Sequence, residues 1–152
     1  MINFYYVASS DWLNTGMRLC FAALIGAIIG LERQLKNKPA GLRTHMLVSL
    51  GSSVFSLITI QIGGTEFSAD SLSRVVQGIA AGVGFLGAGE ILRESSQSSK
   101  SLEIHGLTSA AAIWVSAALG IAAGCGLWQL GLMGAILTVI ILHIFKRLEK
   151  FY

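Results

Sequence analysis

The chain has 152 residues, of which 53% are hydrophobic and only 12% are charged, and its formal net charge is +3. A soluble domain carries about 25% charged residues, so this composition excludes an ordinary soluble domain and favours a protein embedded in a lipid bilayer. The basic residues stand at the ends of apolar runs, which argues against nucleic acid as a partner and indicates a cytoplasmic membrane face.

Five segments are long and apolar enough to cross a bilayer, which requires about 17–25 residues. They cover residues 13–31, 42–63, 75–92, 107–123 and 127–145. The sequence therefore predicts an all-α membrane protein, a five-helix transmembrane bundle that occupies residues 1–152 as a single domain. Only three residues, 124–126, separate the last two segments, so those helices should be antiparallel neighbours.

The distribution of Lys and Arg predicts the orientation of the bundle. With five helices, one side of the membrane receives the first–second connection, the third–fourth connection and the C-terminus. Of the eleven Lys and Arg residues, all but Arg18 and Arg74 fall on that side. The positive-inside rule then places the N-terminus outside and the C-terminus in the cytoplasm. Arg18 is expected to extend its guanidinium outward to water.

The 18 glycines require an explanation, because glycine weakens a helix in water. In lipid, small residues allow helix backbones to approach closely. Residues with GxxxG spacing, or close to such a pair, are Gly26, Gly30, Gly78, Gly82, Gly84, Gly87 and Gly89. We expect these glycines, with Trp114, to pack helices together. The third helix should be the most closely packed, either at the centre of the bundle or at the interface of a homodimer.

Ionisable and polar residues gather at the expected cytoplasmic ends of the helices. They are Glu32, Arg33, Arg43, Thr44, His45, His105 and Thr108. Glu32 near a helix C-terminus and Arg43 near a helix N-terminus both oppose the helix dipole, so we expect them to form an ion pair. A sharper hypothesis makes Arg43, Thr44 and His45 an anion site for a lipid headgroup or a partner, at a helix N-terminus.

Metal binding and transport are alternatives that the same residues leave open. Mg²⁺ needs only one or two protein carboxylates, and Glu32 and Glu90 could supply them, although their spacing is not diagnostic. A transporter normally carries ionisable residues deep in its helices, and the middle of each expected helix lacks acids and bases. A small multidrug exporter is a further alternative, but it would need an acid deep in the first helix, and Glu32 lies at the end of that helix. No catalytic motif occurs, so we expect no enzyme and no resident cofactor.

Five motifs in order resemble the MgtC/SapB family of bacterial inner-membrane proteins. They are GLERQ at 30–34, AGLRTH at 40–45, GVGFLGAGEI at 82–91, HGLTSAAAIW at 105–114 and GIAAGCG at 120–126. The resemblance implies a multi-pass inner-membrane protein of magnesium homeostasis, acid stress and virulence-type adaptation. It implies that the protein acts without catalysis on other membrane proteins, such as the membrane sector of the rotary ATP synthase. A Mg²⁺ or other cation transporter is the alternative.

The resemblance also assigns roles to residues, and this sequence departs from the family in two places. The implied inner-face polar residues are Glu32, Arg43, Thr44 and Thr108, with the motif glycines and Trp114 in packing roles. Glu90 stands where the family commonly has an uncharged residue. Several members carry a soluble C-terminal domain, and we expect this chain to be the membrane domain only.

Overall fold

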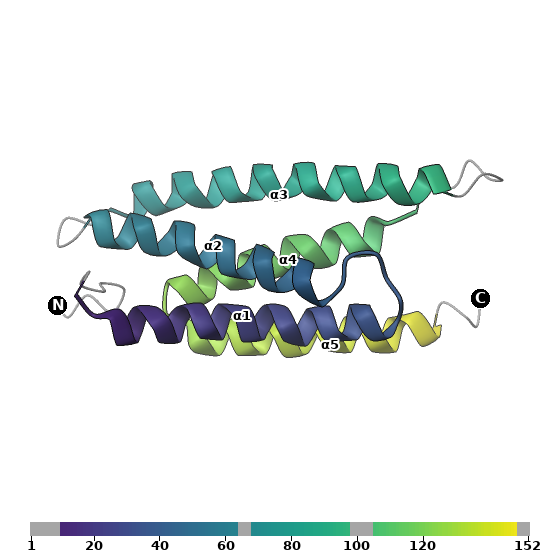
Figure 1. Ribbon diagram of the computed structural model, residues 1–152, viewed down its shortest axis with the longest axis horizontal. Coiled ribbons are helices and arrows are strands. Elements are labelled where there is room, and N and C mark those ends of the chain that lie inside the picture. Colours follow the sequence, from purple (N-terminus) through teal and green to yellow (C-terminus); the bar gives the residue numbers. More distant parts are fainter. Residues whose placement is uncertain (1–9, 64–67, 98–104, 149–152) are drawn as a thin grey trace.

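The computed structural model describes residues 10–63, 68–97 and 105–148, and these residues form five α-helices and no strand. The helices lie side by side with alternating direction, so that the molecule is one elongated bundle (Figure 1). Their bounds are α1 Trp12–Leu35, α2 Leu42–Gly63, α3 Ala69–Gln97, α4 Leu107–Gly124 and α5 Trp128–Leu148. The predicted all-α class and the five helices are confirmed.

Within the described residues, four helices are long and apolar enough to cross a membrane, namely α1, α2, α4 and the part of α3 up to Arg93. The apolar part of α5 is shorter and covers Trp128–His143. We call the end of the bundle where α1 and α3 finish and α2 and α4 begin the basic end. The predicted orientation, with the basic end in the cytoplasm, stays a prediction.

The helix bounds differ most from the sequence prediction in α3 and α1. Helix α3 begins at Ala69 rather than 75 and continues to Gln97 rather than 92. The backbone N–H of Ser71 bonds to the Ser68 hydroxyl at 3.3 Å, and Asp70 lies in the first turn, where the helix dipole favours an acid. Helix α1 continues to Leu35, so Glu32 and Arg33 lie inside it. The length of an apolar segment predicts only the part of a helix that lies in lipid. The helices are longer than predicted because capped polar turns continue them beyond that part.

Helix α2 lies against α1 and α4 with almost no side chain between the backbones. A Cβ built on Gly26 of α1 would lie 2.5 Å from the carbonyl oxygen of His45 and 2.7 Å from the Cα of Met46. A Cβ on Gly120 of α4 would collide with the Ser49 carbonyl oxygen. Only glycine permits these distances, and at this range the two backbones gain close dispersion contact.

The expectation of a centrally packed third helix is wrong for the single chain. Helix α3 lies at one side of the bundle (Figure 1), and 17% of its apolar stretch is buried, against 56% in α4. It contacts α4 through Gly87, whose built Cβ would lie 3.3 Å from that of Ala110. A Cβ on any of Gly78, Gly82, Gly84 and Gly89 would meet no described atom within 4 Å. A homodimer seam along α3 stays a prediction.

The turn between α4 and α5 has the antiparallel geometry that the sequence predicted. Gly126 has φ +75, a left-handed conformation that favours glycine. The backbone N–H of Gly126 donates to the Ala123 carbonyl at 3.0 Å, and that of Leu127 donates to the Ala122 carbonyl at 2.8 Å. These bonds satisfy carbonyls that the end of α4 would otherwise leave unpaired.

Adding one methyl group at Gly26 tests the close approach of α2 to α1. We expect Gly26→Ala to lower the free energy of unfolding by about 1–3 kcal/mol, because the new methyl group must push the backbone of α2 away. Gly16→Ala, in the same helix but with no described atom within 4 Å, is the matched control and should cost nothing. Titration with dodecyl sulfate, followed by tryptophan fluorescence, measures both. Equal losses would contradict the packing.

Candidate functional site

Glu32 pairs with Lys36, the residue that caps the end of α1 one turn further along, and not with Arg43. Lys36 also donates to the Leu142 carbonyl of α5 at 3.0 Å, which joins the ends of α1 and α5. Arg43 has an exposed side chain at the start of α2. The expected Glu32–Arg43 ion pair is therefore wrong, because the extra turn of α1 supplies a cation to Glu32 from its own helix.

Arg33 and His45, expected at the surface of the inner face, are buried inside the bundle. The Arg33 guanidinium donates to the hydroxyl of Ser109 in α4 at 2.7 Å. His45 is fully buried, and its Nδ1 lies 2.9 Å from the hydroxyl of Ser116, two turns deeper in α4. Both side chains turn towards α4, Arg33 from α1 and His45 from α2. Two ionisable groups thus occupy the interface of α1, α2 and α4.

A buried polar stripe continues from His45 along α2. It comprises His45, Ser49, Ser52, Ser53 and Ser56. The Ser49 hydroxyl donates to the Ala22 carbonyl of α1 at 2.7 Å. Ser52 and Ser56 donate to carbonyls one turn back in their own helix, at 2.8 and 2.9 Å. The hydroxyl of Ser53 has no partner among the described residues. Two members of the stripe, His45 and Ser49, thus join α2 to its neighbours, and Ser52 and Ser56 are satisfied within α2 itself.

Arg18 closes the opposite end of the interior. The side chain is 4% exposed, and it donates to the Gly124 carbonyl at 2.8 Å and to the Asn14 side-chain oxygen at 2.9 Å. Gly124 is the last residue of α4, where a cation offsets the negative end of the helix dipole. The expectation that Arg18 extends to water is wrong, since this helix terminus offers its guanidinium an internal acceptor.

The remaining predicted residues lie away from this interior. Thr108 is exposed, Thr44 and His105 are half-buried, and Glu90 is half-buried with one carboxylate oxygen covered. Trp114, expected to pack, is 51% exposed on the surface of α4. Within residues 10–63, 68–97 and 105–148, no three His, Cys, Asp or Glu side chains come together as a metal site would require. The structure therefore does not gather the predicted polar residues into one cluster.

The two cysteines are free, and Cys20 is exposed whereas Cys125 is buried. Cys125 lies in the turn between α4 and α5, where burial raises the pKa of its thiol. A raised pKa leaves little thiolate at neutral pH, so Cys125 is a packing residue and a poor nucleophile.

One signal of the buried polar stripe was present in the sequence. His45, Ser49, Ser52 and Ser56 recur at spacings of three and four residues, which places them on one face of a helix. The partners in α1 and α4 carry no comparable signal. Electrostatically, the arrangement places an arginine near each end of the interior and no carboxylate in the polar stripe between them. Such an interior repels a divalent cation.

The family model described as "MgtC family" matches residues 19–151. Protein SrpB of Synechococcus elongatus is 50% identical, and the match covers 98% of this chain and 84% of SrpB. The "Putative magnesium transporter YhiD" of Escherichia coli K12 is 40% identical over 87% of this chain and 60% of YhiD. Protein MgtC of Salmonella typhimurium is 40% identical over 81% of this chain and 48% of MgtC. The chain thus spans about half the length of MgtC. No solved structure matches.

Removing the Ser109 hydroxyl tests the contact between α1 and α4. We expect Ser109→Ala to lower the free energy of unfolding by about 1–3 kcal/mol, because the buried Arg33 guanidinium loses an acceptor. Ser56→Ala is the matched control, since that hydroxyl bonds only to its own helix and such bonds add little stability. The same dodecyl sulfate titration compares the two variants. A Ser109→Ala protein as stable as the Ser56→Ala protein would refute the role of the bond.

Proposed function

This chain belongs to the MgtC family of membrane proteins, and on that premise we propose that it acts in Mg²⁺ and acid-stress homeostasis by modulating other membrane proteins. In this proposal the protein is not an enzyme, and it does not carry Mg²⁺ itself. Two observations together support the proposal. The interior between α1, α2 and α4 is closed and contains buried arginines, whereas α3 leaves a long apolar face uncovered.

Closure of the interior follows from contacts already described. Gly26 and Gly120 bring three backbones together, and Arg18 and Arg33 occupy positions near the two ends. A divalent cation crossing between these helices would have to separate backbones in contact and pass two buried positive charges. Both requirements are costly in a medium of low dielectric constant.

The uncovered face of α3 has the surface chemistry that transmembrane helices use to associate. We call Ala81, Gly84, Phe85, Ala88 and Leu92 the outer face of α3, because these residues share one side of the helix and are exposed. Phe85 is 81% exposed and Leu92 is 72% exposed. The small residues Ala81, Gly84 and Ala88 form a row beside these large apolar side chains. Such a row allows a second helix to approach closely in lipid.

The partner that fits the outer face of α3 is a transmembrane helix. We propose a helix of another membrane protein, for which the membrane sector of the rotary ATP synthase is one candidate. A second copy of this chain, in a homodimer, is the alternative occupant. Either partner would bury the row of small residues. Crosslinking from the outer face of α3 distinguishes them, because the mass of the product identifies the partner.

A second candidate function is Mg²⁺ or other cation transport. The name of the relative YhiD, "Putative magnesium transporter", favours it. The polar residue best placed for it is Glu32, whose carboxylate is mostly covered and already paired with Lys36. We rank transport second, because no three His, Cys, Asp or Glu side chains of the described residues come together to hold a cation.

A photoreactive residue at position 85 tests the proposed contact in native membranes. We expect the residue at position 85 to give a crosslinked product of discrete mass. The control is Leu137, an exposed position on α5, where the yield of crosslinked product should be several-fold lower. Adding Gly84→Leu should reduce the product, because the new side chain fills the row of small residues. Equal yields from positions 85 and 137, or no product from either, would contradict the proposal.

A further inference from the structure

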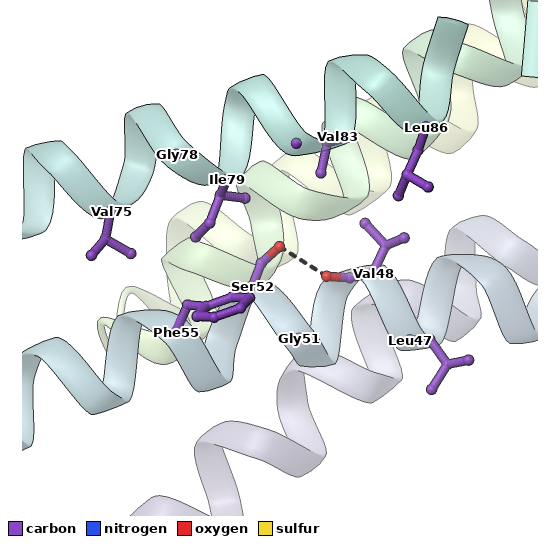
Figure 2. A pocket seen from close by; sticks show the side chains of 11 residues that line it. Leu47, Val48, Gly51, Ser52, Phe55, Val75, Gly78, Ile79, Val83 and Leu86 are labelled. Atoms are coloured by element: carbon purple, nitrogen blue, oxygen red, sulfur yellow. Dashed lines mark hydrogen bonds between the residues drawn. The ribbon is translucent and has the colours of Figure 1, made fainter. Parts of the chain in front are cut away.

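An open groove runs between α2 and α3 on a different side of α3 from the outer face. Its volume is about 610 Å³, and the α3 wall consists of Val75, Gly78, Ile79, Gly82, Val83 and Leu86. Figure 2 shows Val75, Ile79 and Leu86 directed towards α2, with Phe55 on the opposite wall. The Ser52 hydroxyl is turned to the Val48 carbonyl at 2.8 Å, so it offers the groove little polarity. An apolar space of this size within a bilayer does not stay empty.

The dimensions of the groove fit a lipid chain better than a helix. From Val75 to Leu86 the wall extends about 16 Å at 1.5 Å per residue. That length is about half of a hydrocarbon core of roughly 30 Å, which is the depth of one leaflet. A helix with its side chains is about 10–12 Å across and would extend well beyond this groove, whereas a flexible acyl chain can follow it.

An exposed cation stands at the mouth of the groove that faces the basic end. Arg43 is one turn before Leu47, a wall residue, and therefore lies on the same side of α2. Thr44 lies three residues before Leu47 and four before Val48, so it also faces this mouth. The first backbone N–H of α2, from Leu42, is occupied by the Gln34 side chain at 3.2 Å. The following N–H groups, at the positive end of the helix dipole, add to the charge of Arg43.

The position of Arg43 along the bundle suits the headgroup region. Helix α2 begins where its Leu42 meets Gly30 of α1, five residues before α1 ends at Leu35. A long arginine side chain at this depth reaches outward to phosphate while its stem lies along apolar surface. Glu90 lies one turn beyond the wall residue Leu86, so it stands near the same mouth. Arg93, three residues further along α3, offsets the charge of Glu90 and leaves Arg43 as the net cation there.

We propose that the groove binds one acyl chain of an anionic phospholipid, whose phosphate is held by Arg43 at the start of α2. The site is separate from the outer face of α3, and this inference does not depend on the proposed partner. Arg74, the exposed arginine near the other mouth, lies one turn before the wall residue Gly78, but Asp70, one turn before Arg74, offsets its charge. The leaflet at the basic end is therefore the one that supplies the lipid.

Native mass spectrometry of the full chain tests the site. The delipidated protein is titrated with phosphatidylglycerol or with phosphatidylethanolamine of the same acyl chains. We expect wild-type protein to retain phosphatidylglycerol about five-fold more strongly, the factor that one arginine near an anionic headgroup supplies. Arg43→Gln should remove this preference, and Arg74→Gln, the matched control, should leave it unchanged. Equal retention of the two lipids by the wild type, or an Arg43→Gln protein that behaves like Arg74→Gln, would overturn the headgroup assignment.

Filling the groove tests the position of the acyl chain. Gly78→Leu should reduce retention of both lipids several-fold, because the side chain enters the groove where no described atom now lies within 4 Å of its Cβ. Gly84→Leu places the same side chain on the outer face of α3 and should have no effect. Gly51→Leu, on the α2 wall, replaces Gly78→Leu if that variant does not fold. Unchanged retention in the groove variant, or a second copy of the chain bound in place of lipid, would refute the proposal.

Discussion

The close approach of three backbones determines most of what this bundle can do. Helix α2 rests on Gly26 and Gly30 of α1 and on Gly120 and Gly124 of α4, at distances that leave no room for a Cβ. Lipid is as apolar as a leucine side chain, so membrane helices gain stability from such contact and from hydrogen bonds rather than from leaving water. The approach also brings the Ser49 hydroxyl within 2.7 Å of the Ala22 carbonyl.

The same approach explains why the polar interior is closed. His45 reaches Ser116, and Arg33 reaches Ser109, because α2 and α4 lie so near each other and α1. At the other end, Arg18 binds the last carbonyl of α4. Helix α3 meets α4 at Gly87 but is not held in this way, so Gly78, Gly82, Gly84 and Gly89 remain uncovered. Helix α3 and the groove beside it therefore offer surfaces to lipid and to partners outside the core of α1, α2 and α4.

Sequence predicted the helices well because lipid demands a minimum apolar length, and α2 begins and ends at the predicted residues, 42 and 63. It could not tell which glycine pairs are in contact. The pairs Gly26–Gly30, Gly78–Gly82 and Gly120–Gly124 have the same spacing, yet only the first and third meet another backbone. The partners and the directions of the polar side chains were harder to predict than the helix contacts. One added turn of α1 gave Glu32 a different partner, and only the tertiary packing shows that Arg18, Arg33 and His45 point inward.

Transport of Mg²⁺ by the purified chain is the most direct measurement of whether the interior is closed. Proteoliposomes that contain this chain alone, loaded with a Mg²⁺-sensitive dye and placed in an imposed Mg²⁺ gradient, report any flux. The structure predicts uptake no greater than in protein-free liposomes, because Arg18 and Arg33 are buried near the two ends of the interior and the backbone of α2 touches those of α1 and α4. Saturable uptake above that background, abolished by Glu32→Ala, would contradict the account.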